Sequence, residues 1–331
     1  MSDPIGDTLP FVTVILPIRN EEQFIERCLG AVLAQDYPPE WMEILIGDGM
    51  SEDDTRAIIE AMPGAERVQI IPNPRRIQAA AMNITLSYAK GDYVLRIDGH
   101  TIIAPDYVRR CVEHLQRTGA YNVGGAMNPV GVTPMGKAIA AAGKSAFAVP
   151  SAFHVSSQAA FTDTVYMGAF PRQVLVQVGG YNEHVGVNED YELNVRLRRA
   201  GGTIYFAPDI QSLYYGRQTL TALARQYFRY GRSKVQTLRE HPSSLRPRQI
   251  IAPAFVAGIA SVPLLALFAP ALLPVWGGVV LLYVVLTVIV SFRLAAAQGW
   301  ALFGRLLLVF PTIHLAWGCG FWVGVIRPFR R

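Results

Sequence analysis

The chain has 331 residues, enough for one large domain and an additional segment. Its cysteines, Cys28, Cys111 and Cys319, are scattered and odd in number, which argues against a disulfide framework and against a zinc site. The net charge of +5 does not indicate nucleic-acid binding, because no recognition motif accompanies it.

The first two hundred residues alternate between strand-like and helix-like patterns. The run 11–18 is apolar on both faces, as a buried parallel strand should be, and Asn20 is a candidate cap for a helix over 24–33. Further strands are expected at 42–47, 69–71, 93–97, 123–127, 164–170 and 203–206, the last closing the sheet, and further helices at 78–89, 135–147 and 188–198. This order predicts an α/β fold with a mostly parallel sheet, which binds ligands at the carboxyl ends of its strands.

Two apolar segments follow near the C-terminus. From Gln249 to Phe292 the sequence contains no Asp, Glu, Lys, Arg or His. At about 1.5 Å per residue this stretch could cross a ~30 Å hydrocarbon core about twice, with Pro270 and Pro274 suiting the turn. We therefore expect a membrane region over 250–331, formed by a hairpin at 250–292 and a third segment at 306–326.

A basic segment over 219–249 precedes the membrane region, and Glu240 is its only acidic residue. Its basic residues from 225 onward are Arg225, Arg229, Arg232, Lys234, Arg239, Arg246 and Arg248. Such an excess is typical of a cytoplasmic helix near anionic head groups. Because the N-terminus lacks a basic signal-peptide region, we expect the first domain to stay in the cytoplasm, at the inner membrane.

The third segment leaves two topologies open. Three crossings would export Arg327, Arg330 and Arg331, against the positive-inside rule. Alternatively the segment, interrupted by Pro311 and two glycines, dips into the membrane and returns. We expect three crossings.

Six short motifs occur in order along the chain. They are Val14-Ile-Leu-Pro17-Ile-Arg-Asn-Glu21, Gly47-Asp48-Gly-Met-Ser51-Glu-Asp53-Asp54-Thr55, Asn83, Arg96-Ile-Asp98-Gly-His100, Glu189-Asp190, and Gln226-x-x-Arg229-Tyr230. Together they resemble an inverting family 2 glycosyltransferase of the GT-A fold over residues 11–235. The whole chain is similar to membrane-bound bacterial exopolysaccharide glycosyltransferases of the succinoglycan type. The resemblance implies a GT-A domain, with a Rossmann-like sheet, over 1–218.

The resemblance also implies residues that bind a nucleotide-sugar donor. These are Pro17, Arg19, Glu21, Asp48, Arg76 and Asp98. A carboxylate such as Asp48 can accept a hydrogen bond from the imide N–H of uracil, although an Asp before a Gly is also a common turn residue. Arg76 could meet the donor diphosphate or base, but it could equally be an ordinary surface arginine.

The Asp98-Gly99-His100 motif departs from the Asp-x-Asp of the family. A divalent cation would stabilise the departing nucleoside diphosphate, with Asp98 as an oxygen ligand. If His100 replaces the second carboxylate, its nitrogen favours Mn2+ over Mg2+. The alternative is that His100 only caps a helix or touches a phosphate.

The remaining motifs would act on the acceptor. The resemblance assigns the general base of a single displacement to Asp190, with Glu189 beside it, although acidic residues are common at helix starts. Gln226, Arg229 and Tyr230 would contact the diphosphate or the acceptor sugar, and the same helix could instead lie at the lipid interface.

These inferences predict transfer of a hexose from a UDP-sugar to a polyprenyl-diphosphate-linked saccharide, in the assembly of a secreted or surface polysaccharide. One alternative is transfer to polyprenyl phosphate itself. Another, from a different class, is a membrane scaffold without catalytic activity.

Overall fold

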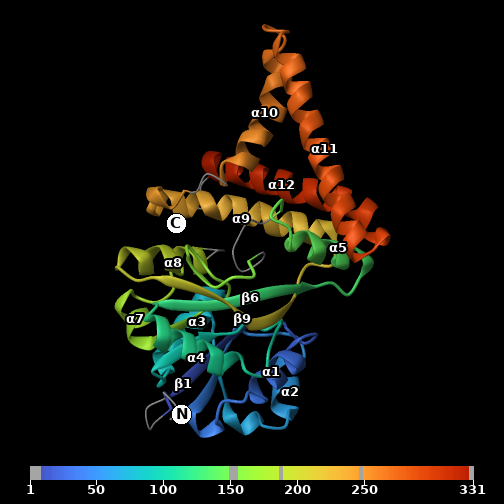
Figure 1. Cartoon of the computed structure of the whole chain (residues 1–331). Helices are drawn as coiled ribbons and strands as arrows, with labels where there is room; N and C mark the ends of the chain where they lie inside the picture. Colours follow the sequence, from blue (N-terminus) through green and yellow to red (C-terminus); the bar gives the residue numbers. More distant parts are fainter. Residues whose placement is uncertain (1–8, 149–155, 186–188, 246–248, 328–331) are drawn as a thin grey trace. The chain divides into compact units, whose positions relative to one another are not determined.

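The computed structural model describes residues 9–148, 156–185, 189–245 and 249–327. The chain forms two compact units (Figure 1). Unit 1 comprises Met1–Asn128 and Ser151–Tyr214, and unit 2 comprises Pro129–Pro150 and Tyr215–Arg331. Each unit is described separately.

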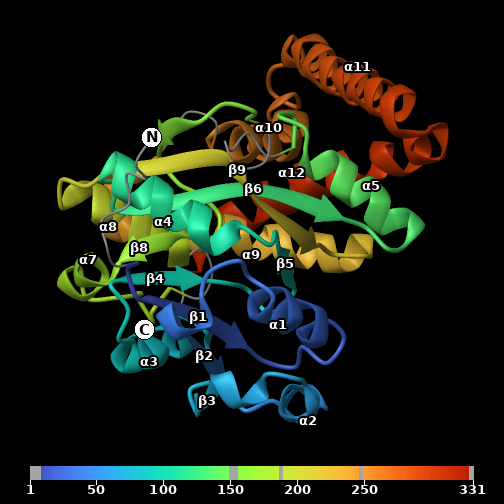
Figure 2. The same ribbon diagram turned by 60° about the horizontal axis from the view of Figure 1, so that its bottom comes forward.

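The first half of unit 1 is a parallel sheet. Its strands are β1 (Val12–Ile18), β2 (Met42–Asp48), β3 (Val68–Pro72) and β4 (Tyr93–Arg96), in the order β3-β2-β1-β4 seen in Figure 2. The connecting helices are α1 (Ile25–Leu33), α2 (Thr55–Ala61) and α3 (Gln78–Tyr88), with short 3-10 turns at Pro39–Trp41 and Ala65–Arg67. Every residue of β1 is buried, as its continuous apolar run predicts.

The second half of unit 1 extends the same sheet with antiparallel strands. These are β5 (Thr101–Ile103), β6 (Asn122–Val130), β7 (Ala160–Thr162), β8 (Ala169–Pro171) and β9 (Ile204–Tyr215). The full order is β3-β2-β1-β4-β8-β6-β9-β5, with β7 also paired to β9. The helices here are α4 (Tyr107–Thr118), α7 (Arg172–Gln177) and α8 (Glu189–Arg199). The predicted α/β class is confirmed, but the sheet is mixed and is parallel only in its first half.

Two apolar clusters cover the two faces of this sheet. Val14 and Leu16 pack in one cluster, whereas Ile15, which points to the other face, packs in the second with Leu45 and Phe170. The strands therefore bury both faces, which fixes their register.

Several predicted elements differ from the observed ones. Asn20 does not cap α1, because the helix begins after Phe24 while the Asn20 side chain accepts from the Glu52 amide at 2.9 Å. The strand expected at 164–170 exists only as β8, and the strand expected at 203–206 is β9, twelve residues long and inside the strand order. β9 extends further because the sequence after Phe206 alternates between buried and exposed residues.

Unit 2 is helical. It contains α5 (Pro134–Gly143), shorter than the predicted 135–147, followed by α9 (Leu220–Glu240), α10 (Ile251–Leu265), α11 (Leu272–Gln298) and α12 (Phe303–Ile326), with 3-10 turns at Pro242–Ser244 and Trp300–Leu302. The turn between α10 and α11 contains Pro270, whereas Pro274 lies in the first turn of α11. α12 continues through Pro311 without a break.

The helices α9 and α12 lie side by side at close range (Figure 1). A Cβ atom on Gly231 would lie 2.0 Å from the Trp317 carbonyl oxygen, and one on Gly320 would lie 2.0 Å from that of Phe228. Near the end of the pair, the Arg239 guanidinium donates to the carbonyl oxygens of Gly324 and Val325. The glycines therefore let the two backbones approach, and α12 follows α9 along its length.

Candidate active site

The candidate donor residues lie at one edge of the sheet in unit 1. Ile18 at the end of β1 pairs with Asp48 at the end of β2, and the Ile97 amide beyond β4 donates to the Ile15 carbonyl oxygen. Since these strands are parallel neighbours, the segments that follow them emerge at the same edge. Arg19, Glu21, Asp48 and Asp98 are thereby brought to this edge, and Pro17 is buried in β1 just before it.

Hydrogen bonds fasten the loop after β1 to the loop after β2. The Asn20 amide donates to Ser51 Oγ at 3.0 Å, and the Glu21 amide donates to Thr55 Oγ1 at 2.8 Å. Asp53 accepts from the Glu22 amide at 3.2 Å. Ser51, Asp53 and Thr55 therefore shape the edge.

Asp48 is fully buried and both of its carboxylate oxygens are engaged. Ser51 Oγ donates to Oδ1 at 2.6 Å, and the Arg56 guanidinium forms an ion pair with Oδ2. The turn role of Asp48 is thus visible in the structure. Arg56 was not singled out in the sequence, although it directly follows the motif that ends at Thr55.

The three arginines near this edge differ in their partners. Arg76 has a positive φ of 59° and pairs with Glu52 at 3.0 Å. Arg75 pairs with Glu183. Arg19 is exposed and has no partner among the residues that the structure describes.

A buried arginine organises the carboxylates. Arg96 is 5% exposed, and its Nε donates to Asp98 Oδ1 at 2.8 Å while its Nη2 lies 3.1 Å from Glu189 Oε1. Its Nη1 is buried and has no hydrogen-bond partner among the described residues. Gln78 Nε2 also donates to Asp98 Oδ1, at 3.3 Å. Arg96 occurs in a motif of the sequence, but its pairing with a residue 93 positions later could not be read there.

Glu189 and Asp190 lie in the first turn of α8, within the helix that was expected at 188–198. Burial raises the pKa of both carboxyl groups, and the charge of Asp98 raises the two pKa values further, whereas Arg96 opposes the shift. Asp190 Oδ1 accepts from the Tyr191 amide at 2.7 Å. A carboxylate with a raised pKa is a stronger base, as proton abstraction requires.

His100 contacts a different acid from Asp98. Its Nδ1 lies 3.0 Å from Glu21 Oε1, and its ring meets the Tyr214 ring edge-on. The Glu21 side chain passes over Gly99, where a Cβ atom would lie 3.0 Å from Glu21 Cγ. Glu21 therefore orients the imidazole, and Gly99 leaves the space for it.

The chemistry of these donors fits a divalent cation. Asp98 offers a carboxylate oxygen, Oδ2, that has no partner among the described residues, and His100 offers an imidazole nitrogen. The residues that the structure describes do not gather three potential ligands at this edge. Any further ligands would therefore come from the diphosphate of the donor or from water.

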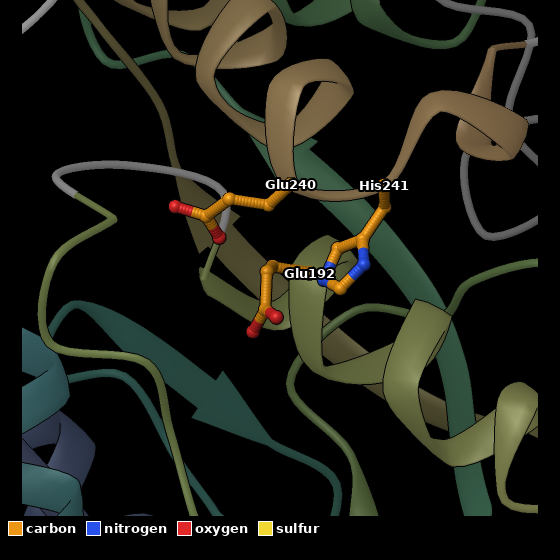
Figure 3. A group of neighbouring side chains, drawn as sticks. All are labelled: Glu192, Glu240 and His241. Atoms are coloured by element: carbon orange, nitrogen blue, oxygen red, sulfur yellow. The ribbon is translucent and has the colours of Figure 1, made fainter.

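Glu192 on α8 is engaged within unit 1 by Arg196. Figure 3 shows Glu192 on α8 of unit 1, and Glu240 and His241 at the C-terminal end of α9 in unit 2. Within unit 1, both carboxylate oxygens of Glu192 accept from Arg196, at 2.8 and 3.0 Å. Arg196 also donates to the Val178 carbonyl oxygen, so Glu192 serves to hold α8 in place.

The Gln226-x-x-Arg229-Tyr230 motif lies on α9 in unit 2. Gln226 Nε2 donates to Tyr230 Oη at 2.8 Å, one helical turn away. The Arg229 side chain is exposed and has no hydrogen bond or ion pair with another described residue. The motif therefore offers a free guanidinium next to a paired amide and phenol.

The fold and these residues define a glycosyltransferase, and comparison with known proteins agrees. Residues 13–142 match Glycosyl transferase family 2, and residues 93–323 match Glycosyl transferase family group 2. The chain belongs to glycosyl transferase family 2.

Individual relatives cover most of the chain. It is 33% identical over 324 residues, 96% of each chain, to the succinoglycan biosynthesis protein ExoA of Rhizobium meliloti (strain 1021). It is 28% identical, over 70% of this chain and 74% of the relative, to the dolichyl N-acetyl-alpha-D-glucosaminyl phosphate 3-beta-D-2,3-diacetamido-2,3-dideoxy-beta-D-glucuronosyltransferase of Methanococcus voltae. The family predicted from the motifs is thus confirmed.

A solved structure supports the fold. The mannosyltransferase PcManGT from Pyrobaculum calidifontis, in complex with GDP-Man and Mn2+, matches 95% of this chain and 89% of its own with a TM-score of 0.58 and 20% identity. The predicted GT-A fold is confirmed by this match.

Proposed function

We propose that this glycosyltransferase transfers a hexose from a UDP-sugar to a polyprenyl-diphosphate-linked saccharide, with inversion, during assembly of an exopolysaccharide. The observation that carries the proposal is the buried group of Asp98, Arg96 and Glu189 beside Asp190 at the sheet edge. The names of the relatives, one in succinoglycan biosynthesis and one acting on a dolichyl-linked sugar, support the pathway and the lipid-linked acceptor.

In this proposal Asp190 is the general base. Its carboxylate takes the proton of the acceptor hydroxyl while that oxygen attacks the anomeric carbon, and the bond to the diphosphate breaks on the opposite face. Burial raises the pKa of Asp190 and makes it a better proton acceptor at neutral pH. Arg96 pairs with Asp98 and with Glu189 and so holds the two carboxylates in place.

The donor would lie along the edge of the sheet. Because Asp48 is fully buried, it would accept from the uracil imide after the half-exposed Arg56 side chain moves off Oδ2, while its contact with Ser51 is kept. Arg19 and Arg76 would meet the base or the diphosphate. A divalent cation, Mn2+ in preference to Mg2+, would be held by Asp98 and His100 and would supply positive charge to the leaving diphosphate.

We also propose that unit 2 attaches the enzyme to the inner membrane with unit 1 in the cytoplasm. The segments Leu272–Gln298 and Trp300–Ile326 are long and apolar enough to cross a bilayer. On α11, Leu281 and Leu282 are 63% and 57% exposed, which a helix in the core of a soluble protein would not be. The α10–α11 hairpin would enter the hydrocarbon.

For α12 the packing favours the return to the cytoplasmic side over a third crossing. α12 follows α9, and α9 carries Arg225, Arg229, Arg232 and Arg239. If α12 crossed the bilayer, these charges would be drawn toward the hydrocarbon, at about 2.5 kcal/mol or more each. We therefore propose that α9 and α12 lie together at the membrane surface, which keeps Arg327 on the cytoplasmic side.

Purified full-length protein, tested with a panel of nucleotide sugars and a defined polyprenyl-diphosphate saccharide, checks the proposal. We expect transfer from a UDP-hexose and none to bare polyprenyl phosphate. Transfer from a nucleotide sugar other than a UDP-sugar would contradict the donor assignment. Transfer to bare polyprenyl phosphate would establish the alternative acceptor, and absence of any turnover would favour the scaffold.

A further inference from the structure

Unit 2 contains a groove of about 560 Å³ whose rim is basic. Arg225 and Arg229 reach it from successive turns of α9, and Arg217 reaches it from the segment just before α9. The other lining residues are apolar. They are Ala222, Ala224 and Phe228 of α9 and Ala316 of α12. The groove thus combines three guanidinium groups with an apolar wall.

The three arginines have no counter-charge inside the described part of the protein. None of their guanidinium groups has a hydrogen bond or ion pair with another described residue. Glu240 is the only acidic residue in the sequence of unit 2, and it lies eleven positions beyond Arg229, roughly 16 Å along the helix. Like charges that share a groove repel, so an anion from outside the protein would stabilise them.

The position of Arg217 is fixed by its neighbour. Gln218 Oε1 accepts from the amides of Val132 and Thr133 at 2.9 and 3.1 Å, and Gln218 Nε2 donates to the Gly216 carbonyl oxygen at 2.7 Å. A Cβ atom on Gly136 would lie only 1.9 Å from Gln218 Oε1. The segment before α9 is therefore held by several bonds, and the Arg217 backbone stays close to the first turn of the helix.

We propose that this groove binds the diphosphate of the lipid-linked acceptor, with Arg217, Arg225 and Arg229 on the phosphate oxygens and the start of the hydrocarbon chain against Phe228 and Ala316. Guanidinium groups suit this ligand, because each can donate two parallel hydrogen bonds to a phosphate. The apolar wall suits a diphosphate attached to hydrocarbon better than a free one. The assignment rests on the proposed function for the identity of the acceptor.

The test measures binding of polyprenyl diphosphate, and separately of phosphatidylglycerol, to the full chain held in phosphatidylcholine nanodiscs, because the α10–α11 hairpin would insert into any vesicle. The variants are Arg217→Gln, Arg225→Gln, Arg229→Gln and the triple variant. Lys137→Gln is the matched control, because it removes one exposed charge from the same unit outside the groove. Circular dichroism and thermal unfolding establish that each variant is folded.

We expect each single variant to weaken binding of polyprenyl diphosphate by roughly 10-fold, the loss typical of a hydrogen bond to a charged group. Binding of phosphatidylglycerol should change little, and in Lys137→Gln the binding of both lipids should stay near the wild-type value. Ala224→Trp, which fills the groove without changing its charge, should weaken the same binding.

Two outcomes would overturn the proposal. The first is a folded triple variant that keeps its affinity for polyprenyl diphosphate. The second is an equal loss for phosphatidylglycerol, which would make the groove a general head-group site. Turnover of UDP-sugars by the wild-type protein is measured separately, so that a failure of the proposed function is distinguished from a failure of the groove.

Discussion

The two units carry the same number of basic residues and use them differently. Unit 2 holds 15 basic residues and one acidic residue, and unit 1 holds the other 15 basic residues and 24 acidic ones. In unit 1, Arg56, Arg96 and Arg196 each contact a carboxylate. In unit 2, Arg225 and Arg229 contact none among the described residues. Charge in unit 1 therefore builds a site inside the protein, whereas charge in unit 2 is available to anions outside it.

Replacing the arginine at the centre of unit 1 should have the largest effect on stability. Arg96→Gln leaves the buried carboxylates of Asp98 and Glu189 without their cation, so the free energy of unfolding should fall by about 3–5 kcal/mol. The control is Arg109→Gln, whose pairs with Asp36 and Glu113 are exposed and should be worth about 0–1 kcal/mol. Chemical denaturation of both variants measures the difference. Equal losses would show that Arg96 does not organise the site.

The dependence of kcat on pH should report the buried carboxyl groups of unit 1. Burial raises the pKa of Asp190, and the base must be ionised to accept a proton. Activity should therefore be lost, as pH falls, at a higher pH than the ~3.9 of an ordinary Asp. When kcat is measured at saturating metal in the His100→Asp variant, the titration of His100 no longer contributes to the pH profile. If activity were lost only at or below pH ~3.9, the pKa of an ordinary Asp, the assignment of Asp190 as the base would be contradicted.

Metal dependence tests whether His100 is a ligand. His100→Asp should shift the preference from Mn2+ toward Mg2+, and His100→Ala should lose more affinity for metal than for nucleotide. In the wild type, binding of metal should weaken as pH falls and His100 becomes protonated, because imidazolium cannot donate a lone pair. Donor binding is measured against metal concentration at two pH values. Identical curves for the three proteins would leave Asp98 as the only protein ligand.

Cysteine labelling of α12 tests whether this helix returns to the cytoplasmic side of the membrane. The test does not depend on an activity assay. Cys28 and Cys111 are buried, and burial raises the pKa of Cys28 to about 12, so neither should react. In a Cys319→Ser background, Ile326→Cys should react with an impermeant maleimide from the cytoplasmic side, because α12 stays beside α9. Labelling from the opposite side alone would restore the three-crossing topology.

The sequence predicted the first half of unit 1 well, because buried parallel strands are continuous apolar runs. β1 and β2 begin and end within one residue of the predicted ranges. α4 was not predicted, although its apolar residues recur at helical spacing, from Tyr107 to Leu115. The remainder of β9 was missed because burial there does not follow polarity, since Ser212 is buried and Leu213 is exposed, and because Pro208 interrupts the pattern.

The candidate site was predicted as motifs but not as contacts. Asp98, Glu189 and Asp190 were identified from their local sequence, whereas the Arg96 bridge between two of them joins residues 93 positions apart. The ion pair between Asp48 and Arg56 and the grouping of Arg217 with Arg225 and Arg229 also depend on folding. Such pairings leave no periodic pattern in a single sequence.

The steady-state kinetics of Asp190→Asn and Arg225→Gln, compared with the wild type, test the division between the units most directly. Asp190→Asn should lower kcat by about 100-fold or more with little change in KM for either substrate, as expected for a lost general base. Arg225→Gln should raise KM for the polyprenyl-diphosphate saccharide and leave kcat near the wild-type value. If Arg225→Gln instead raised KM for the UDP-sugar, or if Asp190→Asn kept near-normal kcat, the assignment of chemistry to unit 1 and of acceptor binding to unit 2 would be wrong.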